Sequence, residues 1–247
     1  MSENKSITRE IVPGQVWGIA RPFYRFGAKV GGRASIIKLF NGDLFIISPT
    51  PIESDTISFI SSIGGQVKYL LAPDIEHYMS LKAWKEAYPD ATIIGPKPLA
   101  DKLTDVEFDI VLTPDHLDEV FGDDEILIHY FPGYFSFEIA VLHVPSGSFF
   151  NADLAEYLPA LEGFSKTPEV DPKTGFKTHL FMKMFSPNNW VHEFVLGNVF
   201  TKDKNAMKRD VKVVSDWKFD RLVPCHGDVM ETGAKKWWDD LYARFLH

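Results

Sequence analysis

The order of the apolar runs along the chain is the feature that most restricts its fold. Between residues 35 and 94, β-forming apolar runs alternate with stretches that carry apolar residues at helical spacing. We expect strands at 35–40, in LFIIS after the Asn41-Gly42-Asp43 turn, at 67–71 and at 91–94, with helices over IESDTISFISSIGG and residues 80–87. This alternation predicts an α/β layer in which helices cover a sheet.

The second half of the chain begins with a different pattern. β-rich runs at 125–130, 138–144 and 148–151 are joined by FPGYFS and PSGS, which predicts a meander of antiparallel strands. Residues 159–187 are rich in Pro, Gly, Lys and Thr and are expected to form a long ordered loop or lid. Helical spacing returns at 204–217, and a short strand at 221–223 precedes a terminal helix over 234–246. We expect residues 1–247 to form a single domain.

Composition excludes several classes of protein. Hydrophobic residues make up 45% of the chain and charged residues 24%, as is usual for a soluble globular protein. The net charge of −8 argues against a general nucleic-acid binder, which needs a basic face for phosphates. The segment MSENKSITREIVPG lacks the apolar stretch of a secretory signal, and no apolar run has membrane-spanning length. A cytoplasmic protein with no membrane partner is expected, and the lone Cys225 excludes an intramolecular disulfide.

Polar side chains follow apolar strands at four places. These are APDIEH (72–77), FPGYFS (131–136), FFNADLAE (149–156) and VPCHGD (223–228). In α/β proteins the carboxyl ends of strands carry ligand and catalytic groups, because the loops there vary while the sheet holds them still. Four such places in one chain favour a functional site.

Together these motifs resemble the metallo-β-lactamase superfamily. In that family a strand ends in His-x-His-x-Asp-His, and later strands supply a His after Pro-Gly, an Asp after a short apolar run and a His in a Pro-x-His-Gly turn. Here the first motif reads APDIEH, Tyr134 stands at the His after Pro-Gly, Asp153 is the later carboxylate and His226 is the final His. The resemblance implies an α/β fold, an αββα sandwich of two mixed β-sheets flanked by helices, with a metal centre at one edge.

The resemblance also implies which ligands remain. The three histidines of the first metal site are replaced by Ala72, Asp74 and Tyr134, whereas the second site keeps His77, Asp153 and His226 with Glu76 in place of Asp. These four residues are the expected ligands of one zinc ion, with iron or manganese as alternatives. We expect Asp74 to orient a water or accept its proton, and Tyr134 to donate a hydrogen bond to a substrate carbonyl or oxyanion.

Most of these residues also have a purely structural interpretation. Asp74 and Glu76 precede a predicted helix and are suited to cap it, and Asp153 is suited to cap a helix that starts at Leu154. Tyr134 is suited to pack as a core aromatic residue. Glu138 either lines the pocket or points to water.

The function expected from the resemblance is metal-dependent hydrolysis of an ester, thioester, lactone or phosphoester in a small-molecule substrate. One alternative is a metal-free descendant of the fold that binds a small molecule or a partner. The other is a redox metalloenzyme with a carboxylate-rich iron site. The sequence leaves open the substrate, which metal binds and whether one binds at all, the oligomeric state, and whether Asp74 or Glu138 takes part in catalysis.

Overall fold

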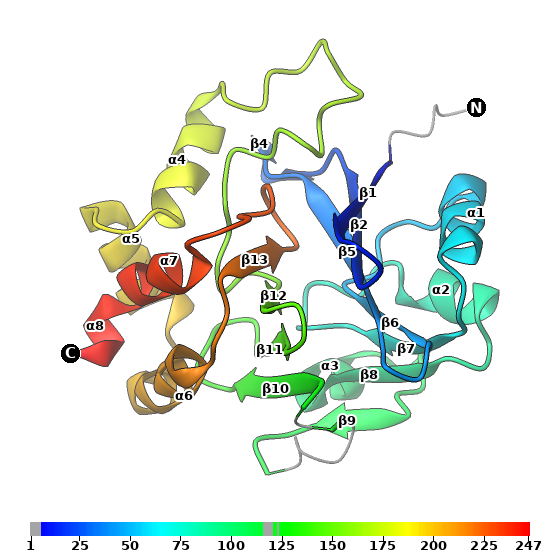
Figure 1. The fold of residues 1–247 in the computed structure, drawn as a ribbon. Helices are drawn as coiled ribbons and strands as arrows, with labels where there is room; N and C mark the ends of the chain where they lie inside the picture. Colours follow the sequence, from blue (N-terminus) through cyan, green and yellow to red (C-terminus); the bar gives the residue numbers. More distant parts are fainter. Residues whose placement is uncertain (1–5, 116–120, 123) are drawn as a thin grey trace.

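The computed structural model describes residues 6–115, 121–122 and 124–247, which form four layers in the order helix, sheet, sheet, helix (Figure 1). The larger sheet has the strand order β1-β2-β5-β6-β7-β8-β9, and the smaller has the order β10-β11-β12-β13. The larger sheet consists of β1 (Ile7–Val12), β2 (Val16–Arg21), β5 (Gly32–Lys38), β6 (Leu44–Ile47), β7 (Val67–Leu71), β8 (Thr92–Pro96) and β9 (Ile110–Leu112). The smaller consists of β10 (Ile126–Phe131), β11 (Glu138–His143), β12 (Ser148–Asn151) and β13 (Arg221–Pro224). The αββα sandwich predicted from the sequence is confirmed.

Alternation along the strands builds the layers. Successive side chains of a strand point to opposite faces of its sheet. Ile37 and Phe150 therefore lie in the apolar cluster between the two sheets, whereas their neighbours Ile36 and Phe149 lie in the two outer clusters. Both faces of these strands are buried, which explains why their sequences read as continuous apolar runs.

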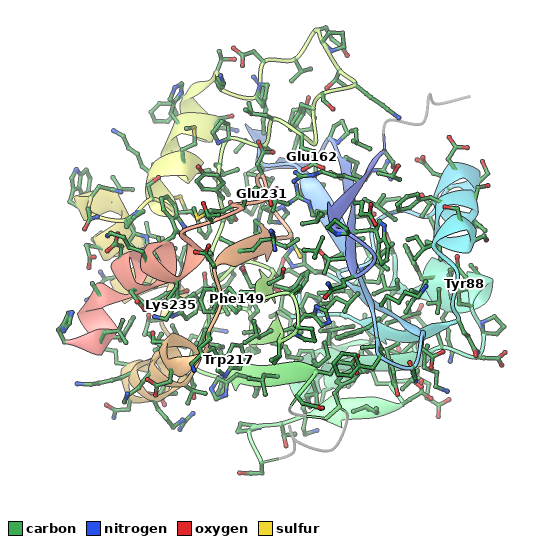
Figure 2. All side chains as sticks on the ribbon, viewed as in Figure 1. Tyr88, Phe149, Glu162, Trp217, Glu231 and Lys235 are labelled. Atoms are coloured by element: carbon green, nitrogen blue, oxygen red, sulfur yellow. The ribbon has the colours of Figure 1, made fainter. Side chains whose placement is uncertain are left out.

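Helices cover the outer face of each sheet. The helices α1 (Ser54–Ile63), α2 (Leu81–Ala87) and α3 (Lys97–Lys102) lie on the side of the larger sheet, and α6 (Lys204–Asp216), α7 (Ala234–Leu241) and α8 (Ala243–Leu246) cover the smaller one (Figure 1). Phe149 of β12 packs beneath this second group, with its ring 6.2 Å from that of Trp217 (Figure 2). Helix α6 begins where the Asp203 side chain accepts hydrogen bonds from the amides of Asn205 and Ala206, which satisfies two free donors of its first turn.

The segment predicted as a long loop is partly helical. Helix α4 (Phe176–Met184) lies within it, and α5 (Trp190–Val195) and a π-helix (Leu196–Phe200) follow. A separate two-stranded hairpin, β3 (Tyr24–Arg25) and β4 (Ala28–Lys29), contacts this region: the Lys29 amide donates to Thr178 Oγ1 at 3.2 Å, and Lys29 Nζ donates to the Asp171 carbonyl at 2.7 Å. The hairpin and the helical segment thus support each other.

The other expected elements agree closely with the structure. The predicted strands at 67–71 and 148–151 have the expected bounds, and the predicted terminal helix is divided at Tyr242 into α7 and α8. No helix of the described residues is long and apolar enough to cross a membrane.

Candidate metal centre

Three side chains from separate strand ends meet at one point. His77 lies in the turn after β7, Asp153 follows β12 and His226 follows β13, and one ligand atom of each lies within 4.8 Å of the others. The Nε2 atoms of His77 and His226 are 3.0 Å apart, and Asp153 Oδ1 lies 3.5 Å from His226 Nε2 and 3.9 Å from His77 Nε2. The two sheets thus bring together donors that lie up to 149 positions apart in the sequence.

Asp74 fixes the ring of His77. Its fully buried carboxylate accepts hydrogen bonds from the backbone amides of Glu76 and His77, both at 2.8 Å, and lies 2.9 Å from His77 Nδ1. Because a carboxylate can only accept here, the Nδ1 atom carries the proton and Nε2 faces the other donors. Asp74 thus caps the turn that carries His77 and not a helix, because α2 begins only at Leu81.

A backbone carbonyl fixes His226 in the same way. His226 Nδ1 donates to the Gly31 carbonyl at 2.6 Å, and the ring stacks on Phe23 with a centroid distance of 5.6 Å. The next residue, Gly227, has φ +87°, and an added Cβ would lie 2.2 Å from the Tyr157 carbonyl oxygen. The PCHGD turn therefore requires glycine at this position.

The two oxygens of Asp153 have different surroundings. Oδ2 accepts a hydrogen bond from Arg25 Nη1 at 3.2 Å, whereas the buried Oδ1 has no hydrogen-bond partner and faces the two imidazoles. The backbone around Asp153 is held by Glu138, whose carboxyl accepts from the amides of Ala152, Asp153 and Leu154. Glu138 neither lines the cavity nor points to water, and no helix starts at Leu154.

This donor set fits a metal ion. Two imidazole nitrogens and one carboxylate oxygen are typical ligands of zinc, with iron and manganese also compatible. Donors about 2.0–2.2 Å from a tetrahedral ion lie roughly 3.3–3.6 Å apart, and the three distances of 3.0, 3.5 and 3.9 Å bracket that separation. The unpartnered Asp153 Oδ1 is a buried acceptor of the kind that a cation satisfies.

Without a metal ion, a proton lies between the Nε2 atoms of His77 and His226. Burial favours a neutral ring, but the charges of Asp74 and Asp153 outweigh it and raise the pKa of His77 to about 10. Burial, only partly offset by Asp153, lowers the pKa of His226 to about 4. The 3.0 Å contact is then a hydrogen bond from protonated His77 to neutral His226, so that a metal must displace a proton to bind.

Two further carboxyls lie buried beside the centre. Burial, together with the nearby charges of Asp74 and Asp153, raises the pKa of Glu138 well above its usual range, although two backbone hydrogen bonds oppose the shift. Burial and the charge of Asp153 do the same to Glu156.

The remaining predicted site residues lie next to the centre rather than within it. The Glu76 side chain is 45% exposed, with Oε2 3.7 Å from Arg25 Nη2, and its role as a fourth ligand stays a prediction. Tyr134 is 1% exposed and packs in the core with Phe135 and Phe200. Its hydroxyl donates to the Asp153 carbonyl at 2.7 Å, which supports the loop of the carboxylate. A catalytic role for Tyr134 also stays a prediction.

A cavity of about 730 Å³ opens onto the centre. Its walls include His77 and His226, and aromatic and apolar side chains form much of the surface, among them Phe23, Tyr24, Phe26, Tyr78 and Met79. Arg25 also lines it. A volume of this size suits a small-molecule ligand.

Solved structures share this arrangement of layers. A metallo-β-lactamase from Pontibacter korlensis is 12% identical, with a TM-score of 0.61, and the match covers 97% of this chain and 98% of that one. The metallo-β-lactamase FIM-1 from Pseudomonas aeruginosa, in the mono-zinc form, is 13% identical with a TM-score of 0.61 and coverages of 97% and 94%. The fold is that of the metallo-β-lactamases. A flavo-diiron protein from Thermotoga maritima has the same fold over 62% of its length, with 16% identity, a TM-score of 0.65 and 97% of this chain covered.

No protein-family model matches the chain, and no curated protein matches it either. The metallo-β-lactamase fold explains why the loops after β7, β12 and β13 meet. The sequence did not indicate the supporting groups of this centre, because Arg25, the Gly31 carbonyl and Glu138 act through tertiary contacts that carry no local motif.

Proposed function

We propose that this protein is a metal-dependent hydrolase of a small-molecule ester, thioester, lactone or phosphoester, with one ion held by His77, Asp153 and His226. The observation that carries this proposal is the convergence of two Nε2 atoms and a partnerless buried carboxylate oxygen beside a cavity that both imidazoles line. A divalent ion in such a set supplies a hydroxide nucleophile near neutral pH, because it lowers the pKa of water. The mono-zinc form of FIM-1 is a precedent for one ion in this fold.

The residues of the chain have separate tasks in this proposal. Asp74 holds the tautomer of His77, and the Gly31 carbonyl holds that of His226, so that both Nε2 atoms face the ion. The second oxygen of Asp74 is buried and has no hydrogen-bond partner, but Asp74 does not line the cavity, so its role as an acceptor for a proton of the attacking water stays a prediction. Glu76 lies at the cavity wall, and its role as a fourth ligand is part of the proposal.

Metal analysis tests the proposal. We would purify the wild type beside His77→Ala and His226→Ala. His179→Ala is the matched control, since His179 is exposed on α4 and its ring contacts the Gly175 carbonyl. About one equivalent of zinc is expected in the wild type and the control, with a loss of at least tenfold in the two site variants. Equal metal in all four proteins would rule out the centre.

An activity panel then tests the reaction. Chromogenic carboxylic, thioester, lactone and phosphate diester substrates should be turned over by the zinc-loaded protein, and a chelator should abolish the rate until zinc is restored. Turnover that survives both chelation and His226→Ala would contradict a metal-dependent hydrolase.

A metal-free binding function is the second candidate. It is favoured by the ion pair between Arg25 and Asp153, in which the guanidinium balances the charge of the carboxylate without a metal ion. Absence of metal after supplementation with zinc, iron and manganese would support this candidate. The flavo-diiron likeness keeps a redox function as a third, for which iron and visible absorbance are the expected signs.

A further inference from the structure

The first metal motif has lost the donors that would hold a second ion. Ala72 has only a buried methyl group, Tyr134 donates its hydroxyl to the Asp153 carbonyl, and Asp74 binds His77 and its turn. Among the described residues, His77, Asp153 and His226 are the one set of three or more His, Cys, Asp and Glu side chains close enough to share an ion. A substrate oxygen that gains negative charge therefore needs another source of positive charge.

Arg25 is placed to supply that charge. It lies on β3, at the edge of the cavity, and its side chain is 18% exposed. One amino group donates to Asp153 Oδ2 at 3.2 Å, and the other lies 3.7 Å from Glu76 Oε2, which is beyond hydrogen-bond distance. A guanidinium has five N–H donors and stays protonated, so donors remain for a ligand in the cavity.

The other basic side chains of the cavity wall contact groups outside the metal centre. Arg21 donates to the Pro51 carbonyl and to Glu53 at 3.4 Å. Arg33 is 1% exposed, pairs with Glu162 at 2.9 Å and donates to two backbone carbonyls. Lys102 donates to the Ile75 carbonyl and lies over the Tyr78 ring. Arg25 differs because the two carboxylates that it contacts, those of Asp153 and Glu76, are both predicted ligands of the metal centre.

We propose that Arg25 binds an oxyanion of the substrate and supplies the positive charge that a first metal ion would otherwise provide. This proposal rests on the proposed function for its catalytic meaning. Planar bidentate contacts make arginine well suited to carboxylate and phosphate groups. The aromatic wall beside Arg25, formed by Phe23, Tyr24 and Phe26, suits an apolar group in the same molecule. The substrate class is thus a small compound that joins an apolar or aryl group to a phosphoryl or carboxyl oxygen.

Ligand binding tests Arg25 independently of turnover. The probe is phenylphosphonate, whose carbon–phosphorus bond resists ester hydrolysis, with uncharged benzamide as the comparison ligand. Binding is measured by calorimetry on the wild type, Arg25→Gln, Arg25→Lys and the charge-matched control Lys212→Gln, whose exposed side chain pairs with Asp216 on α6. Metal content and thermal unfolding are recorded for every sample.

We expect Arg25→Gln to weaken phenylphosphonate binding at least tenfold, Arg25→Lys to weaken it less and Lys212→Gln to leave it unchanged. Benzamide affinity should stay the same in Arg25→Gln, and phenylphosphonate affinities are compared at the metal content recorded for each sample, because Arg25 also contacts the candidate ligand Asp153. Unchanged phenylphosphonate affinity in a folded Arg25→Gln protein, or no binding to the wild type, would overturn the role of Arg25. If the wild type lacks metal and turnover but the Arg25 effect persists, the proposed function fails and the oxyanion site stands.

Discussion

At the scale of single residues, the candidate metal centre depends on groups that hold its ligands in place. The turn that carries His226 is held by backbone hydrogen bonds on both sides of Gly227. The Gly227 amide donates to the Val30 carbonyl at 2.8 Å, and the Asp228 amide donates to the Tyr157 carbonyl at 2.8 Å. Because the backbone of Tyr157 passes so close, no side chain fits at Gly227.

Replacement of Gly227 by alanine should therefore destabilise the protein and displace His226. The left-handed conformation costs an L-residue about 1–2 kcal/mol, and the contact with Tyr157 adds a steric cost. We expect a total loss of about 3 kcal/mol in the free energy of unfolding, with reduced metal content. Denaturant unfolding and metal analysis would measure both effects.

Gly147→Ala is the matched control for this prediction. Gly147 has φ +58°, and an added Cβ would meet nothing within 4 Å. The control should lose only the conformational cost, about 1 kcal/mol, and keep its metal. Equal losses in the two variants would show that the approach of Tyr157 does not restrict position 227.

At the scale of elements, the parts that follow a simple period were predictable from the sequence. The buried strands and the amphipathic helix α6 have the expected positions, because apolar spacing marks the faces that they bury. Helices α4 and α5 were missed, since Phe176, Trp190 and Phe194 are exposed and the segment has no continuous apolar face. The hairpin of β3 and β4 is too short to show a period, and with it Arg25 escaped notice.

The site shows the same division. His77, Asp153 and His226 were predicted because each belongs to a motif after an apolar strand, and the structure brings the three together. The contacts of Arg25 and Glu138 with Asp153 and its loop depend on how the two sheets and the hairpin pack. The spacing of residues in the sequence does not predict that packing.

The end of β11 provides a prediction about pH. His143 is 1% exposed, and burial lowers its pKa to about 4, from 6.5 for the ordinary group. The unfolded chain takes up a proton below pH 6.5 that the folded protein refuses, so this residue contributes stability above pH 6.5 and loses it as the pH falls toward 4. The loss at pH 4.5, relative to pH 7, amounts to about 2–3 kcal/mol.

His143→Asn should remove this part of the pH dependence, because asparagine does not titrate and can keep the contact that His143 Nδ1 makes with Ser146 Oγ at 2.7 Å. Urea unfolding at pH 7 and pH 4.5 would measure the difference for the wild type, the variant and the exposed control His179→Asn. A wild-type slope that persists in His143→Asn would place the titration elsewhere.

At the scale of the whole molecule, stability resides in the clusters between layers. Phe149 is fully buried between the smaller sheet and its helices, with ring centroids 4.8 Å from Phe219 and 5.2 Å from Trp238. Phe149→Ala should cost about 3–5 kcal/mol of unfolding free energy through lost burial and a cavity. Since the ring of Phe149 packs against Trp217, Phe219 and Trp238, metal content per folded chain should not change.

Phe176→Ala serves as the comparison for Phe149, because Phe176 is 83% exposed on α4. Its effect on stability should lie within about 0.5 kcal/mol. Denaturant midpoints and metal analysis would decide the matter. A small effect at Phe149, or a large one at Phe176, would show that the layers are not packed as described.

The position of the centre on the sandwich has a mechanical consequence. His77 belongs to a loop of the larger sheet, whereas Asp153 and His226 belong to loops of the smaller one. An ion bound by all three would link a loop of the larger sheet to two loops of the smaller one. Bound metal would then raise the free energy needed to separate the two sheets. The backbone amides of β7 and β13 would both exchange their hydrogens more slowly.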